Sequence, residues 1–374
     1  MTSLPESVDQ RGRAARQARI LWWLSRMLLA LFVFVGALQL MKTGARHLSI
    51  LQEGGFLVKN AGSTLGLGWL GALLVLSGSP VAASSLTLVA AGEVSKSPDH
   101  FTELQGFTML TGSRLGAAFV VLVTAVVYAV RAGKGGRKAP VTTAIFALLA
   151  TAMVYVPAAF LGAGLLRLHR FHSIDFSLPG SLVDLIDIVY SPVLDRVRDY
   201  APALVFLAGL ACLLVAFKLI DTVLPDLDSE TLESRPGQWL TRKWPMFGLG
   251  CLVALITMSI SVALTVLVPL VAKRYVRVNN ILPYIMGANI TTLGDTMFAA
   301  FTINSAGAVR LVLAEVLAVS FVSILLLSLF YTRILRLLWK VQVIATGSRK
   351  RLAIFTASLF LVPIAIIVVS GVIG

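Results

Sequence analysis

Two pairs of serine residues interrupt apolar segments of this chain, and hydroxyl groups at such breaks can bind ions. Ser77 and Ser79 stand in the sequence Ser-Gly-Ser-Pro, whereas Ser259 and Ser261 stand in Ser-Ile-Ser. An interrupted helix in a membrane leaves backbone carbonyls that suit a cation and free N–H groups that suit an anion. Serine also permits close helix packing or bonds to its own backbone. We favour ion binding, because the serine pair occurs twice.

A second polar cluster stands at the start of a later apolar segment. The sequence Gly287-Ala288-Asn289-Ile290-Thr291-Thr292-Leu293-Gly294-Asp295 contains an amide, two hydroxyls and one carboxylate. An ionised Asp in a membrane helix costs ~2.5–3.5 kcal/mol on insertion scales. We therefore expect Asp295 to face a water-filled cavity or a charged partner; the alternative is a carboxylate that is solvated near the membrane surface.

The first half of the chain has a corresponding sequence, Thr111-Gly112-Ser113-Arg114-Leu115-Gly116. Arg114 is the only arginine in the interior of the apolar segment 106–130. A guanidinium group can bind an oxyanion with two parallel hydrogen bonds. It can equally form an ion pair with Asp295, which would be a structural role. Both roles for Arg114 stay open from the sequence.

These residues lie in a chain with the composition of a membrane protein. Its 374 residues are 57% apolar and only 13% charged, with a mean hydropathy of +0.87, whereas soluble domains carry about 25% charged residues. Each apolar segment is long enough to cross ~30 Å of hydrocarbon as a helix. The segments run over residues 20–41, 62–92, 106–130, 141–166, 201–224, 246–272, 281–303, 308–332 and 352–373.

The net charge of +14 comes from short clusters of Lys and Arg at the ends of apolar segments. Such placement is typical of topology signals and argues against a nucleic-acid partner, since no separate basic domain exists. Cys212 and Cys251 lie inside apolar segments without metal-ligand spacing, and the four histidines do not cluster. We therefore expect no resident metal and no cofactor.

The two interrupted segments are copies of each other. Residues 66–79 and 248–261 are identical at eight of 14 positions, where biased composition alone would give roughly two or three. If both segments enter and leave the membrane on the same face, 21 of the 32 Lys and Arg residues are cytoplasmic and nine lie in outer loops; full crossings give 18 and 12. The positive-inside rule therefore favours two re-entrant hairpins that open to opposite sides.

The predicted fold is an all-α polytopic membrane protein with two inverted repeats, each built from a re-entrant helical hairpin and transmembrane helices. The N-terminus is expected to be cytoplasmic, in the cell inner (plasma) membrane, because it is basic. The first apolar segment is too long for a signal peptide and is expected to be retained as a helix. Arg310 and Glu315 are expected to pair at the membrane interface. The predicted parts are a cytoplasmic tail 1–19, a first half 20–166, an outer amphipathic linker 167–200 and a second half 201–374 with a cytoplasmic connector 225–244.

A serine-containing break followed by Gly-Ala-Asn-Ile and two threonines, in two inverted halves, resembles the sodium–phosphate cotransporter family. The family's repeat typically reads Gln-Ser-Ser-Ser, then Gly-Ala-Asn-Ile-Gly-Thr-Thr. Residues 287–292 are similar to the second element, whereas the breaks at 76–79 and 258–261 each lack the glutamine and one serine. Residues 111–114 depart further. The resemblance covers about residues 60–130 and 246–320.

The resemblance implies a symporter, not an enzyme, that carries inorganic phosphate with sodium across the lipid bilayer by alternating access. Its implied substrate-binding residues are Ser77, Ser79, Ser259, Ser261, Ser113, Arg114 and Asn289, and its implied sodium-binding residues are Asn289, Thr291, Thr292 and Asp295.

Two alternatives stay open from the sequence. Because both glutamines are lost, one is a carrier of another small anion with the same fold, or one without sodium coupling. The other is a membrane-embedded lipid-phosphate phosphatase, which would need a nucleophile or a base beside Arg114.

Overall fold

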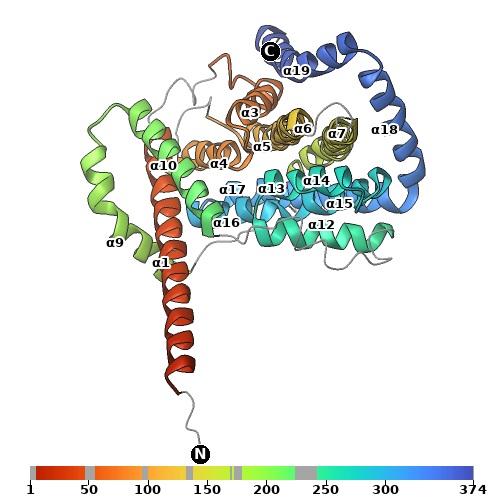
Figure 1. Cartoon of the computed structure of the whole chain (residues 1–374). Helices are drawn as coiled ribbons and strands as arrows, with labels where there is room; N and C mark the ends of the chain where they lie inside the picture. Colours follow the sequence, from red (N-terminus) through yellow and green to blue (C-terminus); the bar gives the residue numbers. More distant parts are fainter. Residues whose placement is uncertain are drawn as a thin grey trace, which may run out of the picture.

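The computed structural model describes residues 6–46, 55–94, 100–131, 138–168, 171, 179–223 and 242–373, and within them it contains helices and no strand. The first half holds α1 (Glu6–Ala45), α3 (Ala61–Val75), α4 (Ser79–Val94), α5 (Glu103–Ala117), α6 (Phe119–Arg131) and α7 (Lys138–Leu166). Then come α9 (Gly180–Val197) and α10 (Pro202–Val223). The rest are α12 (Lys243–Thr257), α13 (Ile260–Thr265), α14 (Leu267–Ala272), α15 (Val278–Thr291), α16 (Leu293–Ile303), α17 (Ala306–Leu325), the π-helical turn η2 (Leu326–Phe330), α18 (Tyr331–Thr346) and α19 (Arg349–Ile373) (Figure 1).

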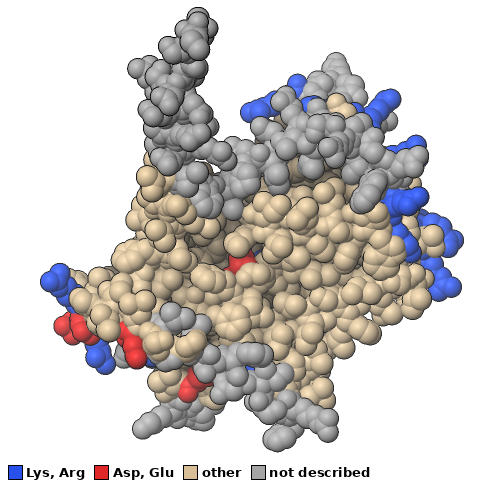
Figure 2. Space-filling view, turned by 90° about the horizontal axis from the view of Figure 1, so that it is seen from below, with Lys and Arg blue, Asp and Glu red and all other residues tan. Residues whose placement is uncertain are grey.

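The predicted membrane-protein class is confirmed at this level. Within the described residues, six helical stretches are long and apolar enough to cross a bilayer: Leu24–Ala45, Glu103–Arg131, Ala139–Leu166, Pro202–Ile220, Ala306–Thr346 and Arg349–Val372. Large apolar side chains on these helices are exposed, for example Phe160 and Leu329, as expected where lipid is the solvent. On the face seen in Figure 2, basic side chains lie toward the margins and the middle is nearly free of charge.

The three remaining apolar segments are each divided into shorter helices. The segment 62–92 forms α3 and α4, the segment 246–272 forms α12, α13 and α14, and the segment 281–303 forms α15 and α16. α3 and α12 both end at a residue in the left-handed conformation, Leu76 with φ of 57° and Met258 with φ of 45°. A non-glycine residue seldom adopts this conformation. The two breaks therefore share an uncommon backbone feature at positions 182 residues apart.

Small residues let α3 and α5 cross with their backbones in contact. A Cβ atom added at Gly68 would meet the carbonyl oxygen of Met109, and one added at Gly112 would meet that of Leu65. Glycine–backbone contacts of this kind are the usual way for membrane helices to approach closely. The crossing fixes the register of α5, which carries Arg114.

The second half repeats this crossing between α12 and α15. An added Cβ at Gly250 would meet the carbonyl oxygen of Tyr284, and one at Gly287 would meet that of Phe247. The contacting residues of α12 stand 182 positions after their counterparts on α3, and those of α15 stand 175 positions after their counterparts on α5. Asn289 on α15 therefore occupies the position that Arg114 occupies on α5.

The helices after the breaks pack between the halves. α4 lies against α16, which follows the Gly-Ala-Asn-Ile sequence, and α13 lies against α6. α17 packs on both α7 and α5, and α15 packs on α7. α1 and α10 pack closely on each other at one side, and α9 contacts α1 (Figure 1). The centre of the molecule is thus where α4, α5, α7, α16 and α17 come together.

The predicted parts of the chain correspond to the helices as follows. Residues 6–19 of the expected tail belong to the helix α1, which continues without interruption into the first apolar segment. The expected amphipathic linker contains α9, whose Tyr190 hydroxyl donates to the carbonyl of Phe32 at 2.8 Å. Residues 225–241 of the expected connector lie outside the described residues.

Gly250→Ala is expected to lower the apparent Tm of the purified protein by several degrees. The added Cβ would press on the Tyr284 carbonyl, and overpacking costs about 1–3 kcal/mol. Gly248→Ala is the matched control on the same helix, because no described atom other than the adjoining backbone of that helix lies within 4 Å of its Cβ position. That variant should keep or raise the Tm, since Ala favours a helix over Gly by about 1 kcal/mol. Equal losses of Tm would contradict the close crossing.

Candidate functional site

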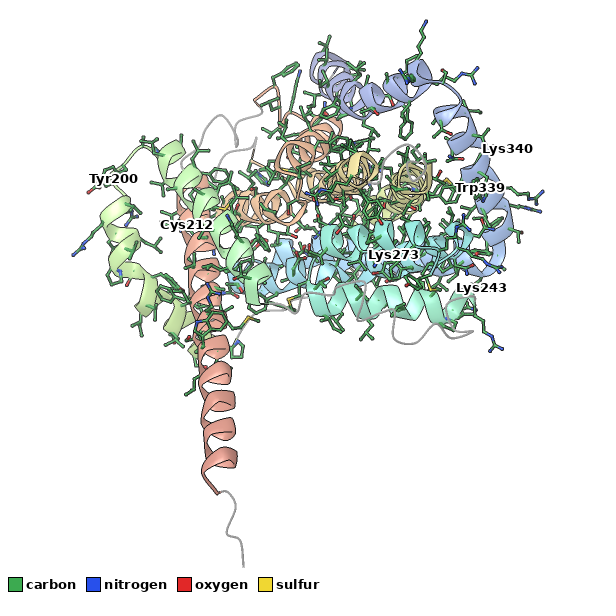
Figure 3. The ribbon with its side chains drawn as sticks, viewed as in Figure 1. Tyr200, Cys212, Lys243, Lys273, Trp339 and Lys340 are labelled. Atoms are coloured by element: carbon green, nitrogen blue, oxygen red, sulfur yellow. The ribbon has the colours of Figure 1, made fainter. Side chains whose placement is uncertain are left out.

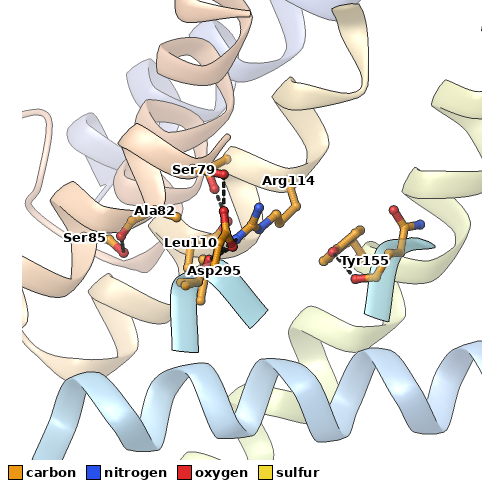
Figure 4. A network of polar contacts seen from close by, with 10 residues as sticks. Ser79, Ala82, Ser85, Leu110, Arg114, Tyr155 and Asp295 are labelled. Atoms are coloured by element: carbon orange, nitrogen blue, oxygen red, sulfur yellow. Dashed lines mark hydrogen bonds and ion pairs between the residues drawn. The ribbon is translucent and has the colours of Figure 1, made fainter. Parts of the chain in front are cut away.

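A buried ion pair joins the two halves of the chain. Arg114 on α5 is 2% exposed, and its Nη2 atom lies 3.5 Å from Oδ1 of Asp295 in the first turn of α16. The same Nη2 donates to Oγ1 of Thr296, whose hydroxyl donates to Oδ1 of Asp295 at 2.8 Å. The Ser79 hydroxyl, at the start of α4, donates to Oδ2 of Asp295 (Figure 4). The sequence left two roles open for Arg114, oxyanion binding and an ion pair with Asp295, and the structure shows the ion pair.

The helix breaks explain why these groups meet. α4 begins directly after the first break, so that Ser79 lies in its first turn. α16 begins at Leu293 after the irregular step at Thr292, so that Asp295 lies in the first turn of that helix. A carboxylate at a helix N-terminus is stabilised by the helix dipole. Two helix starts therefore converge on the carboxylate that pairs with the arginine.

Several polar atoms of α5, of α17 and of the chain from Asn289 to Thr292 are buried without a hydrogen-bond partner among the described residues. Arg114 uses Nη2 but leaves Nε and Nη1 unbonded. The same holds for both side-chain amide atoms of Asn289, for Oγ1 of Thr292 and for Oε1 of Glu315. More than about 90% of buried polar groups in proteins have a partner, including ordered water. These groups are therefore available to ordered water or to a polar ligand.

Tyr155 on α7 links Asn289 to this region. Its hydroxyl donates to the backbone carbonyl of Asn289 at 3.0 Å. Tyr155 is fully buried and lies within electrostatic range of Arg114, Asp295 and Glu315. Figure 4 shows the Arg114 side chain directed toward Asp295.

The predicted ion pair of Arg310 with Glu315 does not form. Arg310 donates to Oε1 of Glu103 through Nε at 3.1 Å and also through Nη2. Its Nη2 lies 3.8 Å from Oε1 of Glu93. Glu315 lies five residues further along α17, is 0% exposed and accepts a hydrogen bond from Thr111 at 2.9 Å. One turn and a half of helix separates the two side chains, which places them in different surroundings.

Glu315 is a residue of this cluster that our sequence interpretation missed. A signal was present, because Glu315 is the only carboxylate between Leu311 and Leu329 and has apolar neighbours on both sides. An ionisable residue in the middle of an apolar helix is by default a candidate functional residue. Its closeness in sequence to Arg310 favoured a surface ion pair instead.

Two predicted site residues have hydroxyls that bond to the backbone. Ser113 donates to the carbonyl of Leu110 at 2.7 Å, within its own helix. Thr291 donates to the carbonyl of Cys251 at 2.8 Å and so stabilises the crossing of α15 with α12. The residue of the first half that corresponds to Thr291 is Gly116, which lies against the carbonyl of Trp69, the counterpart of Cys251. These two hydroxyls thus have a packing role in the described conformation.

The serines of the breaks have different surroundings. Ser259 caps α13 by accepting from the N–H of Val262 at 3.3 Å. Ser261 donates to the carbonyl of Leu76 at 3.5 Å, so the second break touches the first. Ser77 is half-buried at the first break. Of the four serines, only Ser79 reaches the buried ion pair directly.

Arg114→Gln and Asp295→Asn are each expected to destabilise the protein strongly. Each change leaves the opposite charge buried without its partner, which typically costs about 3–5 kcal/mol. The double variant removes both charges and should recover most of that loss. Thermal unfolding of the four proteins in one detergent measures the coupling, and strictly additive losses would show that the two side chains do not interact.

The site is therefore defined by its own geometry: a buried guanidinium with two unbonded donors, a carboxylate held at two helix starts, and a second buried carboxyl nearby. Among the described residues, no group of three or more His, Cys, Asp or Glu side chains could hold a metal ion. Comparison of the chain with protein-family models, with curated proteins and with solved structures finds no significant match.

Proposed function

We propose that this protein is a secondary active carrier of a small oxyanion, in its most specific form a sodium-coupled symporter of inorganic phosphate. The observation that carries the proposal is Arg114, which is buried in the apolar core and has two nitrogens, Nε and Nη1, without a hydrogen-bond partner among the described residues. Placing an arginine in a membrane interior costs several kcal/mol even on insertion scales. Binding an anion would give this buried charge a function that offsets the cost.

The donors around Arg114 suit an oxyanion. Nε and Nη1 carry N–H groups without a partner among the described residues, and such groups of a guanidinium form charge-assisted hydrogen bonds with phosphate or carboxylate oxygens. Asn289, at the equivalent position of the second half, adds an unbonded amide, and Thr292 adds an unbonded hydroxyl. Asp295 neutralises the arginine before the anion arrives, so the empty site carries little net charge from this pair.

Oxygen atoms suited to a sodium ion are carried by residues from Asn289 to Asp295. Hard cations prefer carboxylate, carbonyl and hydroxyl oxygens. The unbonded Oδ1 of Asn289 and Oγ1 of Thr292 are such atoms, and Asp295 supplies a carboxylate. A cation bound there would offset the charge of the anion, which gives a physical reason for symport.

We further propose that the two breaks form re-entrant hairpins and that the halves are inverted repeats. The shared left-handed residues, the repeated glycine crossings and the mutual packing of α4 on α16 and α13 on α6 support this arrangement. Lys243 and Lys273 stand at the two ends of the second broken segment, and in Figure 3 both lie toward the end of the molecule that carries Lys340. Inverted repeats that meet at a midplane site suit alternating access.

The alternative with a specific observation in its favour is a carrier of another small anion. The site offers unbonded guanidinium N–H groups, which other oxyanions also accept. Parallel uptake assays with phosphate, sulfate and arsenate, each with and without sodium, separate these possibilities.

Purified protein in liposomes is expected to take up radiolabelled phosphate when sodium is applied outside. Arg114→Gln, Ser259→Ala and Asp295→Ala should each reduce this uptake at least tenfold, because they remove the anion donor, the cap of the second break and the carboxylate of the pair. Arg26→Gln is the matched control, since that guanidinium stacks on the Trp22 ring at 4.5 Å. Unchanged uptake by the Ser259 and Asp295 variants would refute the assignment.

The hairpin topology predicts the accessibility of single cysteines in a variant that lacks the native ones. Cysteines at Phe56 and His100, which flank the first broken segment, should react with an impermeant reagent added outside. Cysteines at Trp244 and Tyr275, which flank the second, should react only after permeabilisation. All four native side chains are exposed. Labelling of either pair from opposite sides would remove the hairpin and, with it, the proposed site.

A further inference from the structure

We propose that Glu315 binds a proton whose uptake and release are coupled to the anion at Arg114, so that the proton is a second coupling ion of this carrier. This inference rests on the proposed function of the Arg114 site. It concerns a group to which the phosphate and sodium proposals give no role. Its basis is the geometry of one fully buried carboxyl and of the charges around it.

Glu315 lacks the partners that an ionised carboxylate requires. It is 0% exposed, Oε2 accepts one hydrogen bond from Thr111 at 2.9 Å, and Oε1 has no partner among the described residues. Buried carboxylates that stay ionised are paired with a cation or accept several hydrogen bonds. A single neutral hydroxyl supplies neither, so the protonated carboxyl is the form that this environment favours.

Among the described residues, the one buried guanidinium near Glu315 is already engaged. Arg114 gives its ion pair to Asp295, and none of its nitrogens lies within ion-pair distance of Glu315 in the described structure. Helices α4, α5, α7, α15 and α16 pack against α17. The titratable side chains that these helices carry in the described structure are Glu93, Glu103, Arg114, Tyr155, Tyr284 and Asp295.

Most of these groups are occupied elsewhere. Glu93 and Glu103 bind Arg310 near the first turn of α17, and the Tyr284 hydroxyl donates to Ala263 at 2.8 Å. Arg114, Asp295 and Tyr155 remain as the neighbours that share the interior with Glu315. Arg114 and Asp295 cancel each other, so an ionised Glu315 would leave one uncompensated negative charge.

Charge balance then links the proton to the anion. With Glu315 protonated, the described cluster is neutral and can accept an anion at Arg114. With Glu315 ionised, the anion would enter beside a like charge. Two negative charges about 6 Å apart at an effective dielectric of about 20 repel each other enough to reduce the affinity for the anion roughly a hundredfold. Anion and proton therefore favour each other's binding, and this coupling is reciprocal. On release, the O–H bond of Glu315 breaks and the proton passes to water on the side to which the site is open.

Infrared spectroscopy of the protein in liposomes tests the protonation directly and without substrate. Wild-type protein at neutral pH should show the carbonyl band of a buried protonated carboxylic acid, which Glu315→Gln removes. Thr111→Val should shift the band, because it deletes the hydrogen bond to Oε2. Glu103→Gln is the matched control, since that carboxylate binds Arg310 near the first turn of α17, and it should leave the band unchanged. A band that is absent from wild type, or that sodium rather than alkaline pH abolishes, would overturn the proposal.

Uptake driven by a pH gradient tests the coupling. With equal sodium on both sides and acid outside, wild-type liposomes should accumulate radiolabelled phosphate. Accumulation by Glu315→Gln should be at least tenfold lower than that by wild type, whereas Glu103→Gln should accumulate as much as wild type. Equal accumulation by wild type and Glu315→Gln would overturn the coupling. Failure of wild type to take up phosphate under a sodium gradient would instead refute the proposed function, and the infrared result would still decide whether Glu315 holds a proton.

Discussion

The ion pair between Arg114 and Asp295 is the interaction that organises the centre of this protein. A guanidinium without a counter-charge is too costly in an apolar interior, and the only described carboxylate within ion-pair distance comes from the other half of the chain. To reach it, Asp295 must lie at the start of α16 and Ser79 at the start of α4. Both helix starts follow interruptions of apolar segments. Such irregular backbone is tolerated at membrane depth only where protein or water covers it.

The duplicated helix crossings determine where the two halves place their polar groups. Gly68 and Gly112 in one half, and Gly250 and Gly287 in the other, let paired helices touch through their backbones. Equivalent registers follow, so Arg114 and Asn289 stand at equivalent positions. The halves differ in charge, because an arginine in one corresponds to an asparagine in the other. A second buried arginine would need a second acid, and the single pair avoids that cost while leaving donors from both halves free to bind a ligand.

The interior is therefore close to neutral and rich in unbonded donors and acceptors. Neutrality lets the cluster remain buried, and in the proposed carrier the unbonded groups would bind the polar ligand. Glu315 adds a carboxyl whose charge state changes this balance. The proposed anion, sodium and proton sites follow from one constraint, which is that each charge entering the interior must be offset by another.

The sequence by itself determined the class of this protein and the identity of several central residues. The length of the apolar segments, the low charge and the duplication of residues 66–79 at 248–261 predict membrane helices with two breaks, because these properties depend on local composition and spacing. Arg114, Asp295 and Asn289 stood out because polar groups in apolar helices are costly. Only the tertiary structure decided that Arg114 pairs with Asp295, that Thr291 bonds to the Cys251 carbonyl, and that Glu315 turns away from Arg310 toward Thr111. Those partners come from helices up to about 200 residues apart in the chain, and the contacts depend on how the helices cross, which no local pattern specifies.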